Sequence, residues 1–451
     1  MDSLLYLGLM LVVMVGWFAL LKRPVYEAAL VSFLVLLTVT GNWSNVFVYA
    51  QAAMSTSLLY SMLSFVVMSV VLTKTKIIDS CIAVILSLVG RITGGAGYAA
   101  VVASSFLGAL SGSGPGNVMA TGALTIPAMK RSGFPPELAA NIESNASYLG
   151  NMIPPSANIV AAMGAFAAVY PAAGLSTGQF WIILWGIGLY FIAQRLLMVF
   201  AFCKYYKVKP LSKDQLPSFK QTLRTSWQGL LLPVIIIVPF VLDFFLKDGF
   251  FTQRLGAAGA KALSGSMLMF IGGFATMYAC LICKNKKQVT PASLAKIMGS
   301  SVKTIAPTIV VCLFGYMIGE LFSDLNVAES LGGLIGGLRF GKLGTVLAIC
   351  LLTCFMGMVI PGSSQVVIFG PVFITVLANV GVAPLLAAAM LPCICGVMAG
   401  ITPPLALGMY AGMSIAESEF GKTVKNDLWW VAAQFIMQIV MLMGWLPVIG
   451  L

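Results

Sequence analysis

Histidine is absent from this chain of 451 residues, and charged residues make up only 9% of it. The absence of histidine removes the side chain that most often serves as a general base or as a ligand of a transition metal. Nine cysteines are present, but most lie inside apolar runs, and the CxxC at Cys280 and Cys283 has no second pair to complete a metal site. The sequence therefore argues against a metal centre and against a membrane enzyme, which would need a nucleophile, a base or a metal cluster.

Apolar residues, in contrast, make up 59% of the chain and give it a mean hydropathy of +0.98. Such values are typical of a protein that crosses the lipid bilayer many times. The formal net charge is +12, but the basic residues lie in loops between apolar segments, which favours a positive cytoplasmic face and no binding to nucleic acid. Residues 3–22 lack a basic region and a cleavage site, so we interpret them as a retained first span rather than a signal peptide.

A polar stretch of glycine, serine, proline and asparagine interrupts the apolar pattern at residues 111–117. The apolar runs on its two sides, 98–110 and 118–129, are each shorter than the about 20 residues that a spanning helix needs. This pattern predicts a helical hairpin that enters the membrane and returns. The free backbone groups at its tip must be buried in protein or line a wet cavity. For this stretch alone, a turn at the protein surface is the simpler alternative.

The same features occur a second time. A helix interrupted at residues 145–155 follows the first tip, a second tip occupies 356–365, and a second interruption falls at 399–404. Corresponding residues keep a constant spacing, as for Pro136 and Pro384, which are 248 positions apart. Interrupted apolar segments at corresponding places in two halves are typical of the binding site of a secondary transporter.

The other apolar segments predict spanning helices at residues 3–22, 25–41, 57–75, 179–203, 229–246, 263–283, 291–323 and 428–448. Segments 77–90 and 326–339 carry scattered polar positions, and each is expected to lie along the membrane interface or to form a buried tilted helix. With Lys22 and Arg23 in the cytoplasm, most of the 26 basic residues fall on that side. We therefore predict an all-α polytopic membrane protein, an inverted repeat with two re-entrant helical hairpins and two broken helices.

Several segments resemble the large membrane subunit of the tripartite ATP-independent periplasmic (TRAP) transporters, namely residues 108–113, 125–134, 139–143, 152–155, 400–404 and 421–423. The likeness extends over essentially the whole chain, in the same order. The second hairpin departs from the dicarboxylate-type branch, which usually carries an aspartate where this chain has Pro361. Residues 357–363 are more similar to the TAXI-type branch, so the substrate class stays open.

The resemblance implies a carrier in the inner membrane of a bacterium or archaeon that imports an organic anion, usually a carboxylate, on a sodium gradient. It implies two partners, a small membrane subunit of four helices, expected as a separate protein, and an extracytoplasmic solute-binding protein. No cofactor is expected besides Na⁺ as the coupling ion. The resemblance also implies an elevator mechanism. In it, a transport domain of residues 93–203 and 340–451 slides against a scaffold of residues 1–92 and 204–339.

Sodium is expected between each hairpin tip and the neighbouring helix break, held by backbone carbonyls and neutral side chains. The candidate ligands of the first sodium site are Ser111, Ser113, Asn117, Gly150 and Asn151. The candidate ligands of the second sodium site are Gly362, Ser363, Ser364, Gly400 and Thr402. As an alternative, the glycines allow close helix packing and the hydroxyls satisfy backbone groups.

The substrate anion is expected between the two tips, facing the N-termini of half-helices. Candidate contacts are Asn145, Asn151, Asn158 and Gln365, each of which could instead form an interhelical hydrogen bond. Glu143 is a candidate proton carrier, or it orders neighbouring amides or faces the domain interface. Arg195 lies within a span and is expected to reach the membrane interface from the cytoplasmic end of its helix.

Two other transport functions remain as alternatives. One is a free-standing sodium- or proton-coupled anion carrier or antiporter of the same superfamily, which works without a binding protein. The other is a channel, which inverted hairpins with capped tips disfavour because they favour occlusion over a continuous pore.

Overall fold

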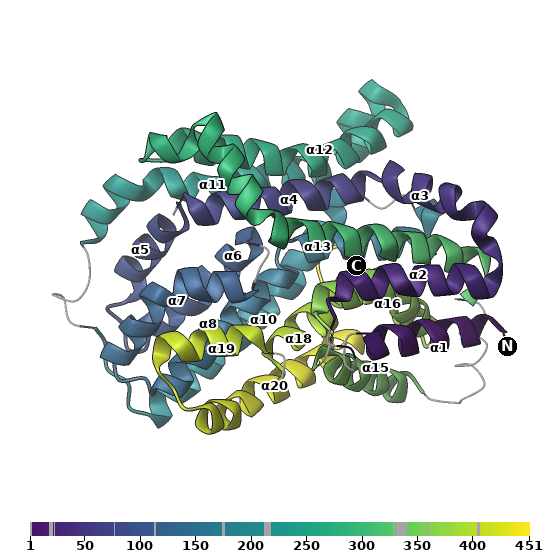
Figure 1. Cartoon of the computed structure of the whole chain (residues 1–451). Coiled ribbons are helices and arrows are strands. Elements are labelled where there is room, and N and C mark those ends of the chain that lie inside the picture. Colours follow the sequence, from purple (N-terminus) through teal and green to yellow (C-terminus); the bar gives the residue numbers. More distant parts are fainter. Residues whose placement is uncertain are drawn as a thin grey trace.

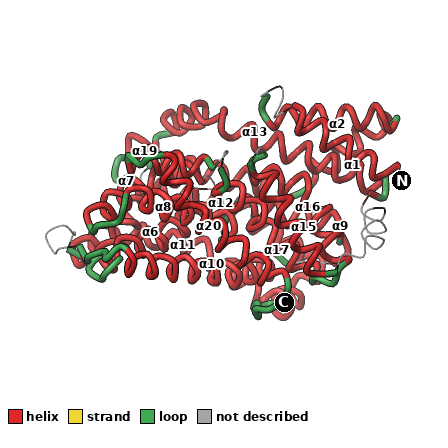
Figure 2. The backbone as a smooth tube through the Cα atoms, turned by 90° about the horizontal axis from the view of Figure 1, so that it is seen from below, coloured by secondary structure: helices red, strands yellow, loops and turns green. Residues whose placement is uncertain are grey.

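The computed structural model describes residues 2–17, 21, 23–75, 77–111, 114–173, 176–211, 218–327, 330, 341–358, 360–403 and 406–451. Over these residues every regular element is a helix and no β-strand occurs (Figure 2). Seven of the described helices are long and apolar enough to cross a membrane, or eight if the bent pair of α8 (Pro136–Leu149) and α9 (Ala157–Val169) is one span. The chain is an all-α polytopic membrane protein, as its composition predicts.

One group of helices comes from the beginning and the middle of the chain. Its members are α1 (Asp2–Val15), α2 (Val25–Thr40), α3 (Val46–Ser55), α4 (Ser57–Lys74), α11 (Phe219–Leu246), α12 (Thr252–Ile282) and α13 (Pro291–Asp324). The helix α4 packs against both α12 and α13, α12 packs against α11, and α13 packs against α2 and α3 (Figure 1). This group therefore forms a continuous layer with α4 on its inner side.

The other group interlocks elements from the two halves of the chain. Its members from the first half are α6 (Gly95–Ser111), α7 (Gly114–Arg131), α8, η3 (Gly150–Met152), α9 and α10 (Thr177–Tyr205). Its members from the second half are α15 (Lys342–Gly357), α16 (Gly362–Asn379), α17 (Pro384–Leu391), the π-helix η8 (Pro392–Val397), α18 (Met398–Ile401), α19 (Leu407–Ala416) and α20 (Phe420–Leu442). Across the halves, α19 packs against α7 and α8, α16 packs against α9, and η3 packs against η8.

Helices end at both predicted tips and at both predicted interruptions. The helices α6 and α7 pack against each other and are separated only by residues 112–113, while α15 and α16 are separated by residues 358–361. The first interruption lies between α8 and α9, which are bent by 40° at the break, and the second lies between α18 and α19. The helix α16 begins 248 positions after α7, at Gly362 and Gly114, so the helix starts keep the spacing seen in the sequence.

Other predictions are refined by the structure. Segment 77–90 forms α5 (Ile77–Val89), which packs against α6, α7 and α11 and buries Ile82 completely, so the buried alternative applies. The short helix α3 was not predicted, and α11 begins at Phe219, ten positions before the predicted span. The first predicted span, 3–22, is described as a helix of 14 residues, and positions 18–20 and 22 lie outside the described residues. Segment 326–339 also lies mostly outside them.

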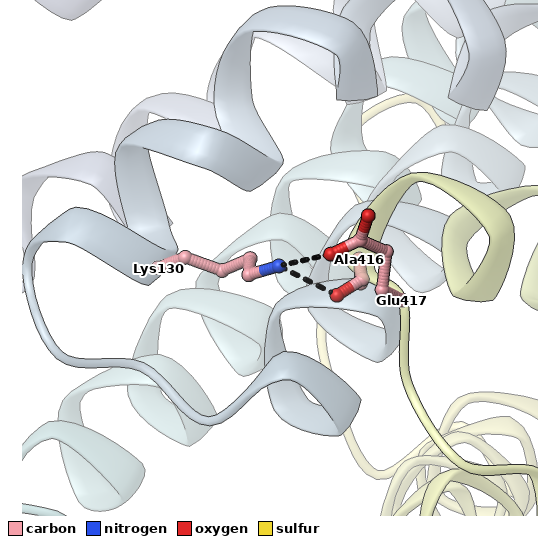
Figure 3. A network of polar contacts seen from close by, with 3 residues as sticks. All are labelled: Lys130, Ala416 and Glu417. Carbon is pink, nitrogen blue, oxygen red and sulfur yellow. Dashed lines mark hydrogen bonds and ion pairs between the residues drawn. The ribbon is translucent and has the colours of Figure 1, made fainter.

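A polar contact joins the two halves at the ends of α7 and α19 (Figure 3). The Lys130 ammonium donates to the backbone carbonyl of Ala416 at 2.8 Å and lies 3.5 Å from a carboxylate oxygen of Glu417. Ala416 is the last residue of α19, and Glu417 ends the helix in the left-handed conformation, with φ of 58°. The lysine thus places a positive charge at the negative end of the α19 dipole.

The first hairpin approaches the end of α8 so closely that only glycine fits. A Cβ atom on Gly108 would lie 2.4 Å from the carbonyl oxygen of Ser147 and 3.2 Å from Cα of Gly150. A Cβ atom on Gly150 would lie 2.2 Å from the carbonyl carbon of Gly108. The two glycines therefore set the distance between α6 and the first helix break.

We expect Gly108→Ala to lower the stability of the purified protein, because the added methyl group meets backbone atoms rather than a flexible side chain. The expected loss is about 1–3 kcal/mol, the usual cost of overpacking, measured as a lower melting temperature in detergent. The control is Gly421→Ala, since a Cβ atom at Gly421 meets no atom within 4 Å. Equal melting temperatures of the two variants would contradict the close approach.

Candidate functional site

A cavity of about 250 Å³ lies where the two tips and the two helix breaks meet α4. The first residues of α7 and α16 line it, together with residues of both interrupted helices. One face of α4 closes it with the side chains of Met62, Phe65, Val66, Ser69 and Val70. The cavity therefore joins the two halves of the chain and both groups of helices.

Four helices begin at this cavity. The first residues of α7, α9, α16 and α19 all line it, and these are Gly114, Ala157, Gly362 and Leu407. The unpaired N–H groups of a helix N-terminus carry partial positive charge, which favours an anion. None of the described residues that line the cavity has a charged side chain. Because α6, α8 and α18 end near the same cavity, backbone carbonyl groups as well as N–H groups face it, and its polarity comes largely from the backbone.

Five of the residues predicted to bind sodium or substrate line this cavity, namely Asn151, Asn158, Gly362, Ser363 and Gly400. The Asn151 amide donates to the carbonyl of Gly396 in the π-helix η8 at 3.2 Å. The first helix break is thus bonded to the second. The structure brings together candidates that are more than 200 positions apart in the sequence.

Asn117 lies within the first turn of α7 and is fully buried. Its amide nitrogen donates to the carbonyl of Ser104 and to the hydroxyl of Ser147, each at 2.9 Å. Its amide oxygen is buried and has no hydrogen-bond partner among the described residues. The other candidates at this tip, Ser113 and the side chain of Ser111, lie outside the described part of the chain.

The second tip has a buried amide of the same kind. Gln365 is fully buried in the first turn of α16, and its amide nitrogen donates to the carbonyl of Ile360 at 2.9 Å. Its amide oxygen also has no partner among the described residues. Ser364 is buried, and the Thr402 hydroxyl donates to the carbonyl of Met398 at 2.7 Å. Gln365, Ser364 and Thr402 lie behind the cavity surface rather than on it.

The sequence analysis missed the tyrosine at the centre of the site. Tyr148 lines the cavity, and its ring occupies the space that a Cβ atom would need at Gly114, Gly400 and Gly408. The ring therefore fills the contact between the first tip and the second break. Tyr148 is the only aromatic residue of α8, next to a helix break. Its position beside the break was the only sequence feature that could have pointed to Tyr148. The glycines that its ring contacts lie in distant segments, so the contact itself could not be predicted.

Glu143 is fully buried in α8, and its carboxylate accepts hydrogen bonds from four hydroxyl groups. These come from Ser104 at 2.7 Å, Ser147 at 3.0 Å, Thr121 and Thr125. Since Ser104 belongs to α6 and the two threonines to α7, the carboxylate ties both arms of the first hairpin to α8. The same hydroxyls can donate to a charged carboxylate or accept from a protonated one.

Asn145 does not line the cavity. Its amide nitrogen donates to a carboxylate oxygen of Asp427 at 2.9 Å and to the carbonyl of Asn141 at 3.0 Å. Asn141 in turn donates to the carbonyl of Thr423 at 2.9 Å and to Asn426 at 3.1 Å. Asn145 thus forms the interhelical hydrogen bond named as the alternative to substrate contact, and it holds α8 to α20.

The expectation that Arg195 reaches the membrane interface is wrong. Its side chain is 0% exposed, and its two terminal nitrogens donate to Gln194 and Gln434 at 2.6 Å each. The guanidinium carbon lies 5.7 Å from the centre of the Trp430 ring, within reach of a cation–π contact. Gln194 lies beside Arg195 in α10, and α20 supplies Gln434 and Trp430. Arg195 therefore has its partners inside the protein and does not need to extend to water.

We expect Arg195→Met to destabilise the protein by about 3–5 kcal/mol, the usual effect of removing one member of a buried set of charges. The substitution removes the donors to Gln434 and the positive charge that acts on buried Asp427. Adding Asp427→Asn should restore part of the melting temperature, because it removes the uncompensated carboxylate. Lys425→Met, at an exposed position of α20, is the control. A double variant no more stable than Arg195→Met would contradict this electrostatic coupling.

Comparisons with known proteins agree on one family. Residues 5–448 match the family described as "Tripartite ATP-independent periplasmic transporter, DctM component". The C4-dicarboxylate TRAP transporter large permease protein DctM of Vibrio cholerae is 27% identical over 379 residues, 80% of this chain and 79% of that protein. The protein of the same name from Pseudomonas aeruginosa is 24% identical over 365 residues, 80% of this chain and 78% of its own. The sialic acid TRAP transporter large permease protein SiaM of Vibrio cholerae is 24% identical over 353 residues, 78% of this chain and 76% of that protein.

Two solved structures share the fold. The YdaH transporter of Alcanivorax borkumensis superimposes with a TM-score of 0.64 and 16% identity, covering 90% of this chain and 88% of that chain. MtrF of Neisseria gonorrhoeae superimposes with a TM-score of 0.65 and 14% identity, covering 92% of this chain and 86% of that chain. At these identities the likeness concerns the fold alone.

Proposed function

Because the chain belongs to the DctM component family of the tripartite ATP-independent periplasmic transporters, we propose that it is the large membrane subunit of a sodium-coupled importer of an organic acid. Its relatives are transporter permeases, and the chain is not an enzyme. The proposal includes a solute-binding protein and a small membrane subunit as partners, in the inner membrane of a bacterium or archaeon. The relatives' names include permeases for C4-dicarboxylates and for sialic acid, which supports an organic acid as substrate.

The observation that carries this proposal is the meeting of four helix N-termini at a cavity whose described lining residues are all uncharged. A carboxylate there would accept hydrogen bonds from backbone N–H groups and would face the positive ends of four helix dipoles. The volume of about 250 Å³ lies just below the about 300–1,000 Å³ of typical ligand pockets, so a small acid fits best. Pro361 lines this cavity. The position at which this chain differs from the dicarboxylate-type branch therefore lies beside the proposed substrate, and we do not assign a dicarboxylate as the substrate.

Sodium is proposed at both tips, and a correspondence between the halves supports this. Asn117 and Gln365 are 248 positions apart, and each is the fourth residue of the helix that follows a tip. Each donates its amide N–H to a nearby backbone carbonyl and keeps a buried amide oxygen without a partner among the described residues. An amide oxygen is a suitable ligand for a hard cation such as Na⁺. We therefore add Gln365 to the second sodium site.

Transport is proposed to follow an elevator movement of residues 93–203 and 340–451 against residues 1–92 and 204–339, with the two halves as an inverted repeat. The nearly constant spacing of helix starts, 248 positions for α7 and α16 and for α8 and α17, supports the repeat. The cavity supports the division into domains, because α4 supplies one wall while tips and breaks supply the others. A substrate site at such a boundary is exposed to either side of the membrane when one part moves.

We expect Ala157→Asp to raise the substrate concentration for half-maximal uptake more than about tenfold, since a negative charge in a low-dielectric cavity repels an anion by several kcal/mol. Ala157 is the first residue of α9, where an aspartate is favourable for the helix itself. Ala157→Asn, of the same size and without the charge, is the matched control. Similar transport by both variants would argue against an anionic substrate at the four N-termini.

The second test is uptake in proteoliposomes that contain the chain and its candidate small subunit, with a sodium gradient and a purified binding protein. We expect sodium-dependent uptake that needs the binding protein. Asn117→Leu, Ser363→Ala and Gln365→Leu should each raise the half-saturating sodium concentration about fivefold, as expected for the loss of one contact worth roughly 1 kcal/mol.

Gln438→Leu is the matched control, because Gln438 is also a buried glutamine whose amide oxygen has no partner among the described residues, but it lies in α20 and donates to the carbonyl of Cys393 rather than to a tip residue. Unchanged sodium dependence in well-folded tip variants would contradict the proposed sodium sites. Uptake without the binding protein would favour a free-standing carrier. Uptake driven by a proton gradient alone, and lost in Glu143→Gln, would make Glu143 the coupling group.

A further inference from the structure

A second cavity, of about 280 Å³, lies between the end of α4, the start of α5, the second and third turns of α11 and the end of α12. It shares no lining residue with the first cavity. Seven of its lining residues carry uncharged polar side chains, among them Thr75, Ser80, Ser226, Asn285 and Gln288. Polar side chains in such number are unusual on a helical layer whose other faces are apolar.

The cavity lies at a boundary between apolar and charged surface. The apolar part of α12 ends at Ile282 and is followed by Lys284, Lys286 and Lys287, while α4 ends at Lys74. The first turns of α11 carry Lys220 and Arg224 before its apolar part begins. Three apolar helices thus change to basic sequence at the same level, which is where the headgroups of a bilayer lie.

The chemistry of the lining is that of a phosphate site. Lys284 supplies a positive charge, the hydroxyls of Ser80 and Ser226 and the side-chain amides supply donors, and none of the described lining residues is acidic. The hydroxyls of Thr75 and Thr225 donate to backbone carbonyls of their own helices.

Ile77, the first residue of the 13-residue helix α5, also lines the cavity and brings backbone N–H groups to it. Because α4 and α12 end at the same cavity, the helix dipoles add no net positive charge, and the positive charge comes from Lys284. Charge, hydroxyls and backbone N–H groups together are the usual ligands of a phosphate.

Apolar side chains continue from the cavity along the outer surface of α11 and α12. Trp227 is 50% exposed and precedes the lining residue Gln228, and Leu281 is 65% exposed and precedes the lining residue Ile282. The Tyr278 hydroxyl donates to the carbonyl of Gln228 at 2.9 Å, which holds the two helices together there. A ligand with a charged head and a long apolar tail would match both surfaces.

We infer that this cavity binds the phosphate of an anionic phospholipid, whose acyl chains lie along α11 and α12. The apolar surface beside the polar cavity favours a lipid over free phosphate as the source of that group. A lipid in this position would contact α4, α5, α11 and α12 at once. Its role is then to join four helices at the membrane surface, separately from the transport site.

The test uses the purified full chain in mixed micelles with increasing phosphatidylglycerol or phosphatidylcholine, with the melting temperature as readout. We expect phosphatidylglycerol to stabilise the wild type more than phosphatidylcholine does. Lys284→Gln should raise the phosphatidylglycerol concentration for half-maximal stabilisation about fivefold, as expected for one lysine near an anionic lipid. Gln288→Glu, which adds a carboxylate of the same size to the lining, should abolish the preference.

Lys425→Gln is the control, since it makes the same change of charge at an exposed position outside the cavity. Equal phosphatidylglycerol responses in Lys284→Gln, Gln288→Glu and Lys425→Gln would overturn the assignment. So would equal stabilisation by phosphatidylcholine. Stabilisation by inorganic phosphate alone, weakened in Lys284→Gln, would assign the cavity to free phosphate and overturn the lipid as its source.

Discussion

Backbone that leaves a helix inside a membrane needs hydrogen-bond partners or a polar cavity, because lipid offers neither. In this chain four interrupted places, two tips and two breaks, come together at one cavity with a wall supplied by α4. Placed separately against lipid, each would leave several N–H and C=O groups unsatisfied. Where the four places meet, they supply some of one another's hydrogen-bond partners. For example, the side-chain amide of Asn151 donates to the carbonyl of Gly396.

This gathering depends on close packing between the halves. Gly108 and Gly150 let the first hairpin touch the first break, and Gly400 and Gly408 make room for the ring of Tyr148. In a membrane, such small residues replace the hydrophobic driving force with direct contact between helices. A change of a few tenths of an ångström at these contacts would move the tips relative to the breaks. The geometry of the site therefore rests on packing as much as on the polar residues that line it.

The tips and breaks could be predicted from the sequence because short apolar runs, prolines and a constant spacing are local signals. The positions of Asn151, Ser363 and Gly400 at one cavity followed from those signals. Arg195 and Asn145 could not be placed in the same way, since their partners Gln434 and Asp427 lie more than 200 positions away on a helix whose facing side no local pattern reveals. Tyr148 was missed for the same reason, because a buried aromatic ring looks like ordinary core until its glycine partners are known.

Comparing corresponding positions of the two halves shows which residues of the site are repeated and which occur in one half only. Asn117 and Gln365 correspond, and both are neutral amides in the first turn after a tip. Glu143 does not follow this rule, since the position 248 residues later is Leu391, buried at the end of α17. A carboxylate without a counterpart at the corresponding position of the other half cannot belong to a property that both tips share. Its four hydroxyl partners lie on α6, α7 and α8. We therefore interpret Glu143 first as the group that fixes the first hairpin to its broken helix, while the paired amides carry the chemistry common to the two tips.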